Sequence, residues 1–313
     1  MAEKIVTKKT KLSGIFIYPI KGISGLSLPE VKINADGIEH DRKWMIIDVT
    51  GNSKTPNPII NQFVTQRAGS PGSAEAKTLC LIKPTLIESS DGFAFMLSAP
   101  DMPDIEIREN NFPEPAEPII VSIWDDKCQA IEASPEINDW FTKYINKERK
   151  DKRQYKLVMK SRNDKRKSRK SDVPLGSFAD GYPVSIISQE SLAEFNHRCG
   201  ASEPLLMNRF RPSFVIENVD AHDEDRIKLM KIGPQRVTLR WRKQIKRCKV
   251  TMNNQETAQV GREPLTTLYT YRKLPGEKEV VFGSYFDPES TGAIRVGDEI
   301  EIIELGDYGT CPV

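Results

Sequence analysis

The chain has 313 residues, of which 38% are hydrophobic and 29% charged, a composition typical of a soluble globular protein that argues against a disordered chain. Its length exceeds the usual size of one domain and predicts either one large mixed domain or two closely packed ones. Five cysteines without any C-x-x-C pair argue against a disulfide framework and a structural zinc site, and they favour a reducing compartment.

The net charge of +2 conceals one basic segment. Residues 147–170 contain thirteen Lys or Arg against three Asp or Glu, which leaves a net charge of about minus eight for the rest of the chain. Nucleic-acid binding is not favoured, because the segment has one aromatic residue, Tyr155, and little apolar periodicity. A solvated loop is predicted instead.

No apolar run approaches the ~20 residues needed to cross a bilayer, and residues 1–12 lack a secretory hydrophobic region. No transmembrane segment is therefore expected. The first residues are rich in Lys but contain no Arg, so a cytoplasmic protein is the simpler expectation and a mitochondrial one the alternative.

The first part of the chain predicts short strands separated by turns. A strand is expected at 12–18, and Pro19 ends it because proline cannot donate to the ladder. The glycine-containing loop after Lys21 can bring backbone N–H groups close to an anion, with a plain turn as the alternative. Further antiparallel strands are predicted at 42–48, 79–82, 93–97 and 118–124.

Two helices are predicted near the middle of the chain. Ser134 and Pro135 are typical of an N-cap and a first helical position, and apolar residues then recur at helical spacing as far as Ile145. Ser188, at the end of a strand expected at 184–187, should cap a second helix. That helix is expected to pack Leu192, Phe195 and Cys199 against the core.

The last third of the chain predicts strands at 213–216, 236–242 and 296–303 and a short helix at 263–272. Arg209 and Arg211 stand beside the rigid Pro212, where they could hold a phosphate, with a surface salt bridge as the alternative. Many short strands, few helices and no βαβ rhythm predict a mixed α/β, predominantly β architecture of barrel type.

Cys248 follows the predicted strand at 236–242 and has an unusually basic setting. Positive charge close to a thiol favours its thiolate, which attacks electrophiles and binds soft metals. The alternative is that Cys248 is a small buried apolar residue, as most cysteines outside disulfides are. The cations that flank it are Lys243, Lys246, Arg247 and Lys249.

Common catalytic motifs are absent from the sequence. Its three histidines stand in no H-E-x-x-H motif, and there is no G-x-S-x-G elbow, no phosphate-binding P-loop and no G-x-G-x-x-G. One thiolate with several distant cations fits a soft metal carried by an anionic organic cofactor. Those cations are Lys21, Arg42, Arg67, Arg209, Arg211 and Arg247.

Seven short motifs follow one another in an order that resembles a known family. The order is similar to that of proteins with a molybdenum cofactor sulfurase C-terminal (MOSC) domain, and the nearest group is the mitochondrial amidoxime-reducing component and its bacterial relatives. The motifs lie at 18–21, 41–44, 65–67, 178–183, 209–212, 246–248 and 263–265.

The resemblance implies a MOSC-type β-barrel with an N-terminal MOSC β-barrel domain and a few flanking helices. The implied division is an N-terminal barrel domain at 12–133, a helix and basic linker at 134–174 and a MOSC domain at 175–305. Cys248 is the implied metal ligand to molybdenum, and Arg247 and Thr251 are implied with it as catalytic. The implied cofactor-binding residues are Lys21, Arg42, Thr65, Arg67, Asp180, Arg209, Arg211 and Ser213.

The activity implied by the resemblance is reduction of small N-hydroxylated substrates such as amidoximes, with a molybdenum cofactor (molybdopterin). Electrons would come from NADH through cytochrome b5 reductase and cytochrome b5, for which the basic segment could provide a docking surface. Pyridoxal phosphate binding is a further expectation from the family.

The chain departs from the family motifs at Gly22, at Ser213 and at 251–254, where Thr-Met-Asn-Asn replaces Thr-Thr-Val-Asp. These changes alter polar contacts to the cofactor and remove a carboxylate near the metal. They leave open an alternative function, in which the chain is a catalytically silent MOSC-fold protein that acts as a structural or binding module in a larger assembly.

Overall fold

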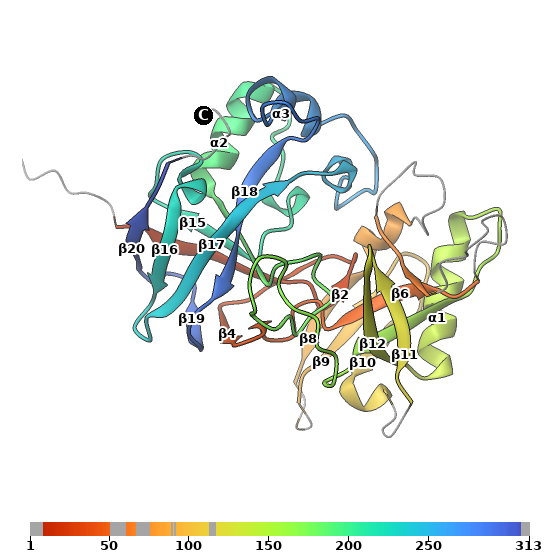
Figure 1. The fold of residues 1–313 in the computed structure, drawn as a ribbon. Coiled ribbons are helices and arrows are strands. Elements are labelled where there is room, and N and C mark those ends of the chain that lie inside the picture. Colours follow the sequence, from red (N-terminus) through yellow and green to blue (C-terminus); the bar gives the residue numbers. More distant parts are fainter. Residues whose placement is uncertain are drawn as a thin grey trace, which may run out of the picture.

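The computed structural model describes residues 9–50, 61–66, 76–88, 90, 92–112 and 117–307. They form two halves, a broad sheet built mainly from the second part of the chain and a small barrel with its neighbours (Figure 1). The predominantly β architecture predicted from the sequence is therefore confirmed. Within these ranges, none of the helices has the length and apolar character needed to span a membrane.

The broad sheet has eight strands, and only the pair β14–β15 is parallel. In sheet order they are β20 (Ile300–Leu305), β16 (Ile227–Ile232), β17 (Val237–Lys246), β18 (Val281–Pro288), β14 (Val184–Ser188), β15 (Phe214–Glu217), β1 (Lys11–Ile17) and β3 (Leu26–Ser27). The sheet curves so that the start of β1 also meets the start of β20: the Leu12 N–H donates to Asp298 O at 2.9 Å, and the Ile300 N–H donates to Thr10 O at 2.9 Å. The predicted first strand thus belongs to the sheet of the second half.

The barrel is a closed ring of five strands, because its last strand pairs with its first. The ring runs through β6 (Trp44–Asp48), β7 (Gln62–Phe63), β11 (Ile119–Ile123), β12 (Asp126–Glu132) and β13 (Tyr155–Lys160), and β2 (Ile20–Lys21) adds to β6. Strand alternation divides β6 between two cores: Met45 and Ile47 pack with Val121, whereas Trp44 and Ile46 pack with residues of the helix α1 (Pro135–Ile145).

β13 lies inside the basic segment, so the prediction of a solvated loop at 147–170 was wrong. Tyr155 and Leu157 are buried, and even Lys160 is buried, in an ion pair with Asp164. The strand was missed because it is short and stands among many cations. This part of the segment closes the barrel.

Two small sheets complete the strands, namely β8 (Lys83–Ile87) with β9 (Ala94–Ser98) and β10 (Ile105–Arg108), and β19 (Gly292–Arg295) with β4 (Glu30–Asn34) and β5 (Gly37–Ile38). The predicted strand at 79–82 was wrong, because η1 (Lys77–Leu81) is a 3₁₀ helix. A short buried apolar run does not distinguish strand from helix by periodicity. The other 3₁₀ helices are η2 (Glu109–Asn111), η3 (Asn146–Glu148), η4 (Met207–Arg209), η5 (Asp223–Asp225) and η6 (Lys249–Met252).

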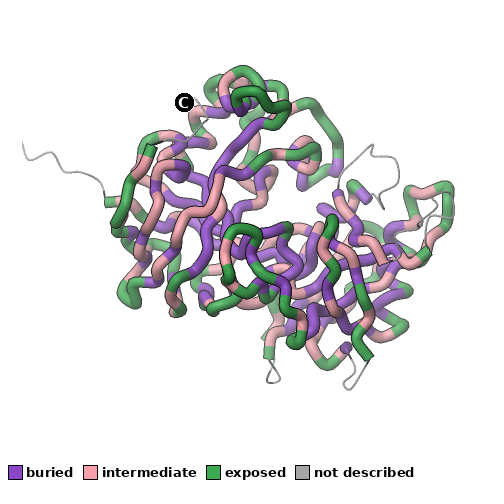
Figure 2. Tube along the Cα trace, in the orientation of Figure 1, coloured by how far each residue is buried: buried purple, intermediate pink, exposed green. Residues whose placement is uncertain are grey.

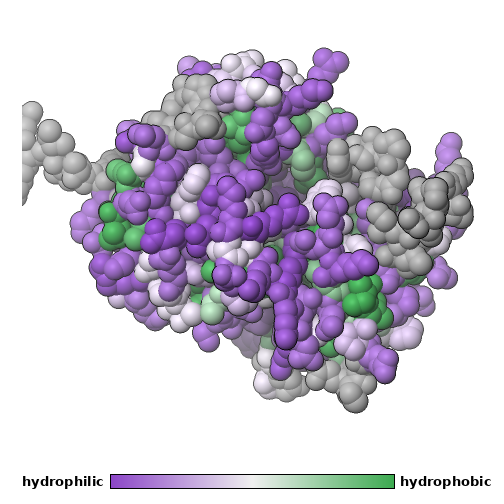
Figure 3. Space-filling view, viewed as in Figure 1, coloured by the Kyte–Doolittle hydropathy of each residue, from purple (hydrophilic) through white to green (hydrophobic). Residues whose placement is uncertain are grey.

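The helices α1, α2 (Gln189–Cys199) and α3 (Leu265–Tyr271) confirm the predicted helical segments. Ser188 caps α2 as predicted, since its Oγ accepts a hydrogen bond from the Ser191 N–H at 3.0 Å. Buried chain fills the interior of both halves (Figure 2). The face shown in Figure 3 is mainly hydrophilic, with small separate hydrophobic patches.

Candidate functional site

Cys248 lies at the end of the longest strand of the broad sheet. β17 ends at Lys246, and Cys248 is the residue before η6, so the predicted position just past a strand end is confirmed. The Cys248 side chain is exposed, which contradicts the alternative of a buried apolar thiol. The chain after β17 continues toward the barrel half of the molecule (Figure 1).

Cys248 opens into a cleft between the two halves. Nine of the predicted site residues line this cleft, although they come from segments far apart in the sequence. They are Lys21, Arg42, Thr65, Asp180, Arg209, Arg211, Arg247, Cys248 and Thr251.

Two predicted site residues are not in this lining. Arg67 lies outside the described residues. Ser213 is fully buried one layer behind, with its Oγ 3.2 Å from the Oγ of Ser185, which does line the cleft. A contact from Ser213 to a bound molecule would therefore pass through Ser185.

The described lining of the cleft is strongly cationic. It contains six Lys or Arg residues, and Asp180 is its one carboxylate. Cations gathered in a partly enclosed cleft concentrate anions there, because the field of one sign of charge is focused between low-dielectric walls. The cations are Lys21, Arg42, Arg209, Arg211, Lys246 and Arg247.

Tyr18 holds two of these arginines in fixed positions. The guanidinium carbons of Arg42 and Arg211 lie 4.8 Å and 4.1 Å from the centre of its ring. Both arginines have left-handed backbones, with φ of 49° and 53°, a conformation that residues with large side chains rarely adopt. Backbone strain of this kind is concentrated at functional sites, so both observations favour a binding role.

Arg247 lines the cleft and has an unsatisfied buried donor. Its Nε donates to Phe282 O at 2.8 Å and its Nη1 to Phe210 O at 2.9 Å, whereas Nη2 is buried without a hydrogen-bond partner among the described residues. Burial lowers the pKa of Arg247 to about 10, so the group stays charged at neutral pH. An anion in the cleft would satisfy this buried donor, which is costly to leave unpaired.

Arg209 supports the chain that follows Cys248. Its Nε donates to Thr251 O at 2.9 Å, and its Nη2 donates to Met252 O at 3.0 Å and to Glu263 O at 3.1 Å. The Thr251 hydroxyl donates in turn to Cys248 O at 2.9 Å. These bonds fix η6 and hence the direction of the Cys248 side chain.

Asp180 joins three segments at the mouth of the cleft. Its Oδ1 lies 2.6 Å from Lys21 Nζ and accepts a hydrogen bond from Trp124 Nε1 at 2.9 Å. Burial raises the pKa of Asp180, but the charge and hydrogen bonds of Lys21 and Trp124 outweigh it and hold the pKa at about 2. The carboxylate therefore stays ionised across the physiological range.

Several lining residues were not identified from the sequence. Phe63, Trp124, Tyr182 and Tyr285 give the cationic cleft aromatic walls. Gln66, another lining residue, stands inside the Thr-Gln-Arg motif and could have been found there. The aromatic residues carried no comparable signal, because an isolated aromatic residue in a strand or turn predicts core packing as readily as a site.

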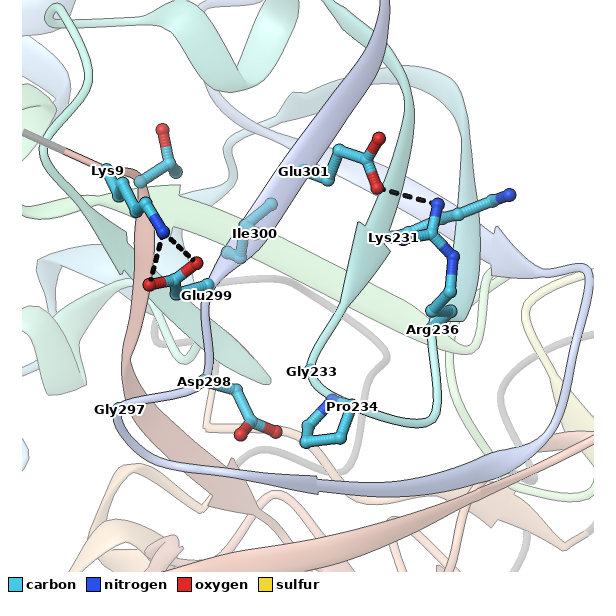
Figure 4. A pocket seen from close by; sticks show the side chains of 11 residues that line it. Lys9, Lys231, Gly233, Pro234, Arg236, Gly297, Asp298, Glu299, Ile300 and Glu301 are labelled. Carbon is cyan, nitrogen blue, oxygen red and sulfur yellow. Dashed lines mark hydrogen bonds and ion pairs between the residues drawn. The ribbon is translucent and has the colours of Figure 1, made fainter. Parts of the chain in front are cut away.

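A second hollow lies at the start of β20, where the β16–β17 turn meets the beginning of β1 (Figure 4). Its charges pair with each other: Lys9 lies 2.8 Å from Glu299, and Arg236 lies 2.6 Å from Glu301. The three cations of its lining are matched by three carboxylates, so this hollow is a weaker candidate for binding an anion than the cleft at Cys248.

The structure of the described ranges contains no group of three or more His, Cys, Asp or Glu side chains placed to hold a metal ion. Cys248 is the one soft metal ligand among the residues that line the cleft. The thiol, the cations around it and the buried donor of Arg247 fit an anionic group that carries a metal.

Comparisons with known proteins identify two domains in this chain. Residues 9–148 match the model of the MOSC N-terminal beta barrel domain, and residues 176–301 match that of the MOSC domain. The mitochondrial amidoxime reducing component 2 of Rattus norvegicus is 28% identical over 92% of this chain and 82% of its own length. The mitochondrial amidoxime-reducing component 1 of Xenopus laevis is 26% identical, over 92% and 81% respectively.

The molybdenum cofactor sulfurase of Arabidopsis thaliana is also similar, with 29% identity over 92% of this chain. The chain spans only 35% of the length of that protein. The two family matches cover most of the chain and meet at the cleft that holds Cys248. The chain therefore belongs to the family of proteins that combine a MOSC N-terminal beta barrel domain with a MOSC domain.

Proposed function

We propose that this chain binds a molybdenum cofactor in the cleft, with Cys248 as the protein ligand to the metal. The observation that carries the proposal is an exposed thiol in a cleft lined by six cations, one of which, Arg247, has an unsatisfied buried donor. A thiolate is a good ligand for a soft metal, and guanidinium groups bind phosphate through paired N–H donors. Names of similar proteins, which mention molybdenum cofactor and amidoxime reduction, point in the same direction.

The residues divide into groups with different tasks. Arg42, Arg211 and Arg247 would bind the phosphate and pterin, and Lys21 would add charge at the mouth of the cleft. Arg209 would keep η6 in place through its three backbone hydrogen bonds. Roles of Thr65 and Arg67, and an indirect role of Ser213 through Ser185, stay predictions.

We further propose that the reaction is two-electron reduction of N-hydroxylated compounds. The N–O bond of an amidoxime breaks, and two electrons and two protons convert it to an amidine and water. The cofactor would supply the redox chemistry, while the chain orients the substrate. Tyr285 lines the cleft, and burial raises its pKa to about 12, so its protonated hydroxyl can donate a hydrogen bond to the substrate.

The electron donor would dock beside the cleft on a basic patch, formed by Arg169, Lys170, Lys243 and Lys246. Burial and the charges of the other three residues lower the pKa of Lys243, which indicates how closely these cations gather. Lys246 also lines the cleft, and the Arg169 side chain lies against Gly181. An acidic donor such as cytochrome b5, reduced by its NADH-dependent reductase, would fit this surface.

Reduction of benzamidoxime by a chemically reduced viologen dye tests the activity without a protein donor. Protein produced in a host that makes molybdenum cofactor should consume the dye and form benzamidine. Cys248→Ala should lose this activity, whereas Cys199→Ala, at the half-buried last residue of α2, should keep it. Equal rates for wild type and Cys248→Ala would contradict the proposal.

A second candidate function is a silent MOSC-fold module in a larger assembly. The stretch after Cys248 is largely occupied with structural contacts: Asn253 is buried and its Nδ2 donates to Lys77 O at 2.8 Å. Stable incorporation into a protein complex without molybdenum would support this candidate. Pyridoxal phosphate binding and a cytoplasmic or mitochondrial location also stay predictions.

A further inference from the structure

Trp124 occupies a backbone position that disfavours a large side chain. Ile123 pairs with Asp126, so Trp124 and Asp125 form the two-residue turn between β11 and β12. The φ of Trp124 is 52°, in the left-handed region where such turns normally place Asn, Asp or Gly. A bulky residue there is an outlier that costs free energy, and outliers of this kind are concentrated at functional sites.

The Trp124 side chain is held in one orientation. Its Nε1 donates to Asp180 at 2.9 Å, and Asp180 is itself fixed by the ion pair with Lys21 at 2.6 Å. The indole also meets the buried ring of Phe63 edge-on, at 5.0 Å between ring centres and 71° between ring planes. Two contacts of different kinds therefore set the plane of the ring.

Folding alone does not explain this arrangement, because 46% of Trp124 stays exposed. By comparison, Trp44 is fully buried and Trp140 is 6% exposed. Trp124 lines the cleft that contains Cys248, so part of its surface borders the space where a substrate would bind. A rigid and half-exposed aromatic face is suited to stacking with a flat, unsaturated group.

We propose that Trp124 is the specificity-determining wall of the cleft and stacks with the planar aromatic part of an uncharged substrate. The cations of the cleft disfavour a cationic substrate, and a neutral aryl group gains most from an apolar ring face. The identity of the head group that is reduced rests on the proposed function, whereas the stacking role of Trp124 does not depend on it. Aryl substrates should therefore be preferred over alkyl substrates with the same head group.

Two amidoximes with the same head group test the preference. In wild-type holoprotein with a reduced viologen dye, the ratio of kcat/KM for benzamidoxime to that for acetamidoxime should favour the aryl compound. Trp124→Leu should lower this ratio by about three- to tenfold, the range expected for loss of one aromatic pair. Trp124→Phe should keep most of the ratio, because it retains a ring.

Ile120→Ala is the matched control, because Ile120 is exposed on β11, the strand that leads into the turn at Trp124, and is not among the residues that line the cleft. It should leave the ratio unchanged. A ratio that stays the same in Trp124→Leu, or that falls equally in Ile120→Ala, would overturn the stacking role.

Binding of benzamide separates this inference from the proposed function, because benzamide has the ring but no N-hydroxyl group. Ligand-observed NMR on the holoprotein should give a Kd that rises about three- to tenfold in Trp124→Leu. If benzamide binding depends on Trp124 but the protein reduces no amidoxime, the stacking role of Trp124 is supported and the proposed reductase activity is contradicted. If the wild type reduces amidoximes but shows no detectable binding of benzamide, the reductase activity is supported and the stacking role of Trp124 is contradicted.

Discussion

Among individual residues, Arg247 connects the buried core of the second half with the cleft. Two of its nitrogens donate to the carbonyls of Phe210 and Phe282, and the third, Nη2, is buried without a partner among the described residues. A lysine could not reproduce this division, because it lacks the planar fork of donors. Cys248, the next residue, is thereby placed beside a fixed positive charge.

Glu224 and Asp225 form a second buried group behind the cleft. Ser188 Oγ donates to Glu224 at 2.9 Å, and Ser191 Oγ donates to it at 2.8 Å. Burial, together with the charge of Asp225, raises the pKa of Glu224 from 4.5 to about 7. The folded protein thus keeps a proton on Glu224 at pH values where the unfolded chain has released it.

This proton makes stability depend on pH. The contribution of Glu224 is fully present below pH 4.5 and is lost as the pH rises through about 7. Glu224→Gln imitates the protonated acid, so the free energy of unfolding, measured with urea at a series of pH values, should fall less with rising pH across this window. Above pH 7, the fall in the free energy of unfolding should be smaller in Glu224→Gln than in wild type by roughly 3 kcal/mol. Glu203→Gln, at an exposed site, should keep the wild-type profile, and a wild-type profile in Glu224→Gln would contradict the assignment.

At the scale of elements, the loop after η6 joins the two halves below the cleft. Gln255 and Gln66 are both buried and exchange amide hydrogen bonds of 3.0 Å and 3.3 Å. Arg211 Nη1 also lies 3.4 Å from Gln255 Oε1. Gln255, in the MOSC half, therefore contacts both Gln66 of the barrel half and Arg211 of the cleft.

Gln255→Ala should destabilise the protein, because it removes the donor to the buried Oε1 of Gln66. The expected loss is about 1–3 kcal/mol in the free energy of unfolding, measured with urea. Gln259→Ala is a suitable control, since Gln259 is exposed in the same loop and should change stability little. Similar losses in both variants would argue against the amide pair as the connection.

The sequence predicted most elements whose signal is local. The cap at Ser188 and the alternation before Cys248 identified α2 and β17, because hydroxyl capping and strand periodicity depend on neighbouring residues. η1 and β13 were missed because tertiary contacts decide their conformation. Trp124 was missed as a site residue for the same reason, since its role depends on Asp180, which is 56 residues away in sequence.

At the scale of the whole molecule, the two halves are interlocked. β1 comes from the segment that matches the N-terminal domain model but pairs with β15 in the broad sheet. The cleft at the junction therefore depends on both halves, and its mouth borders the basic patch. This arrangement puts the proposed docking surface next to the proposed metal site.

Docking on the basic patch should depend on salt and on charge. With cytochrome b5 as the electron donor, the apparent KM for the cytochrome should rise with ionic strength, because exposed charges are screened within a Debye length of about 10 Å at 0.1 M salt. Lys170→Glu should raise this KM several-fold, without changing the rate with a viologen dye. Lys32→Glu, an equal charge change on β4, should have little effect. Equal effects of both variants would refute docking at the patch.

The molybdenum content of the purified protein tests the central claim most directly. Wild type from a host that makes molybdenum cofactor should contain near-stoichiometric molybdenum by inductively coupled plasma mass spectrometry. Cys248→Ala, folded as judged by circular dichroism, should contain almost none, and Cys199→Ala should match wild type. Metal-free wild-type protein from such a host, or equal molybdenum in wild type and Cys248→Ala, would contradict the proposed role of Cys248.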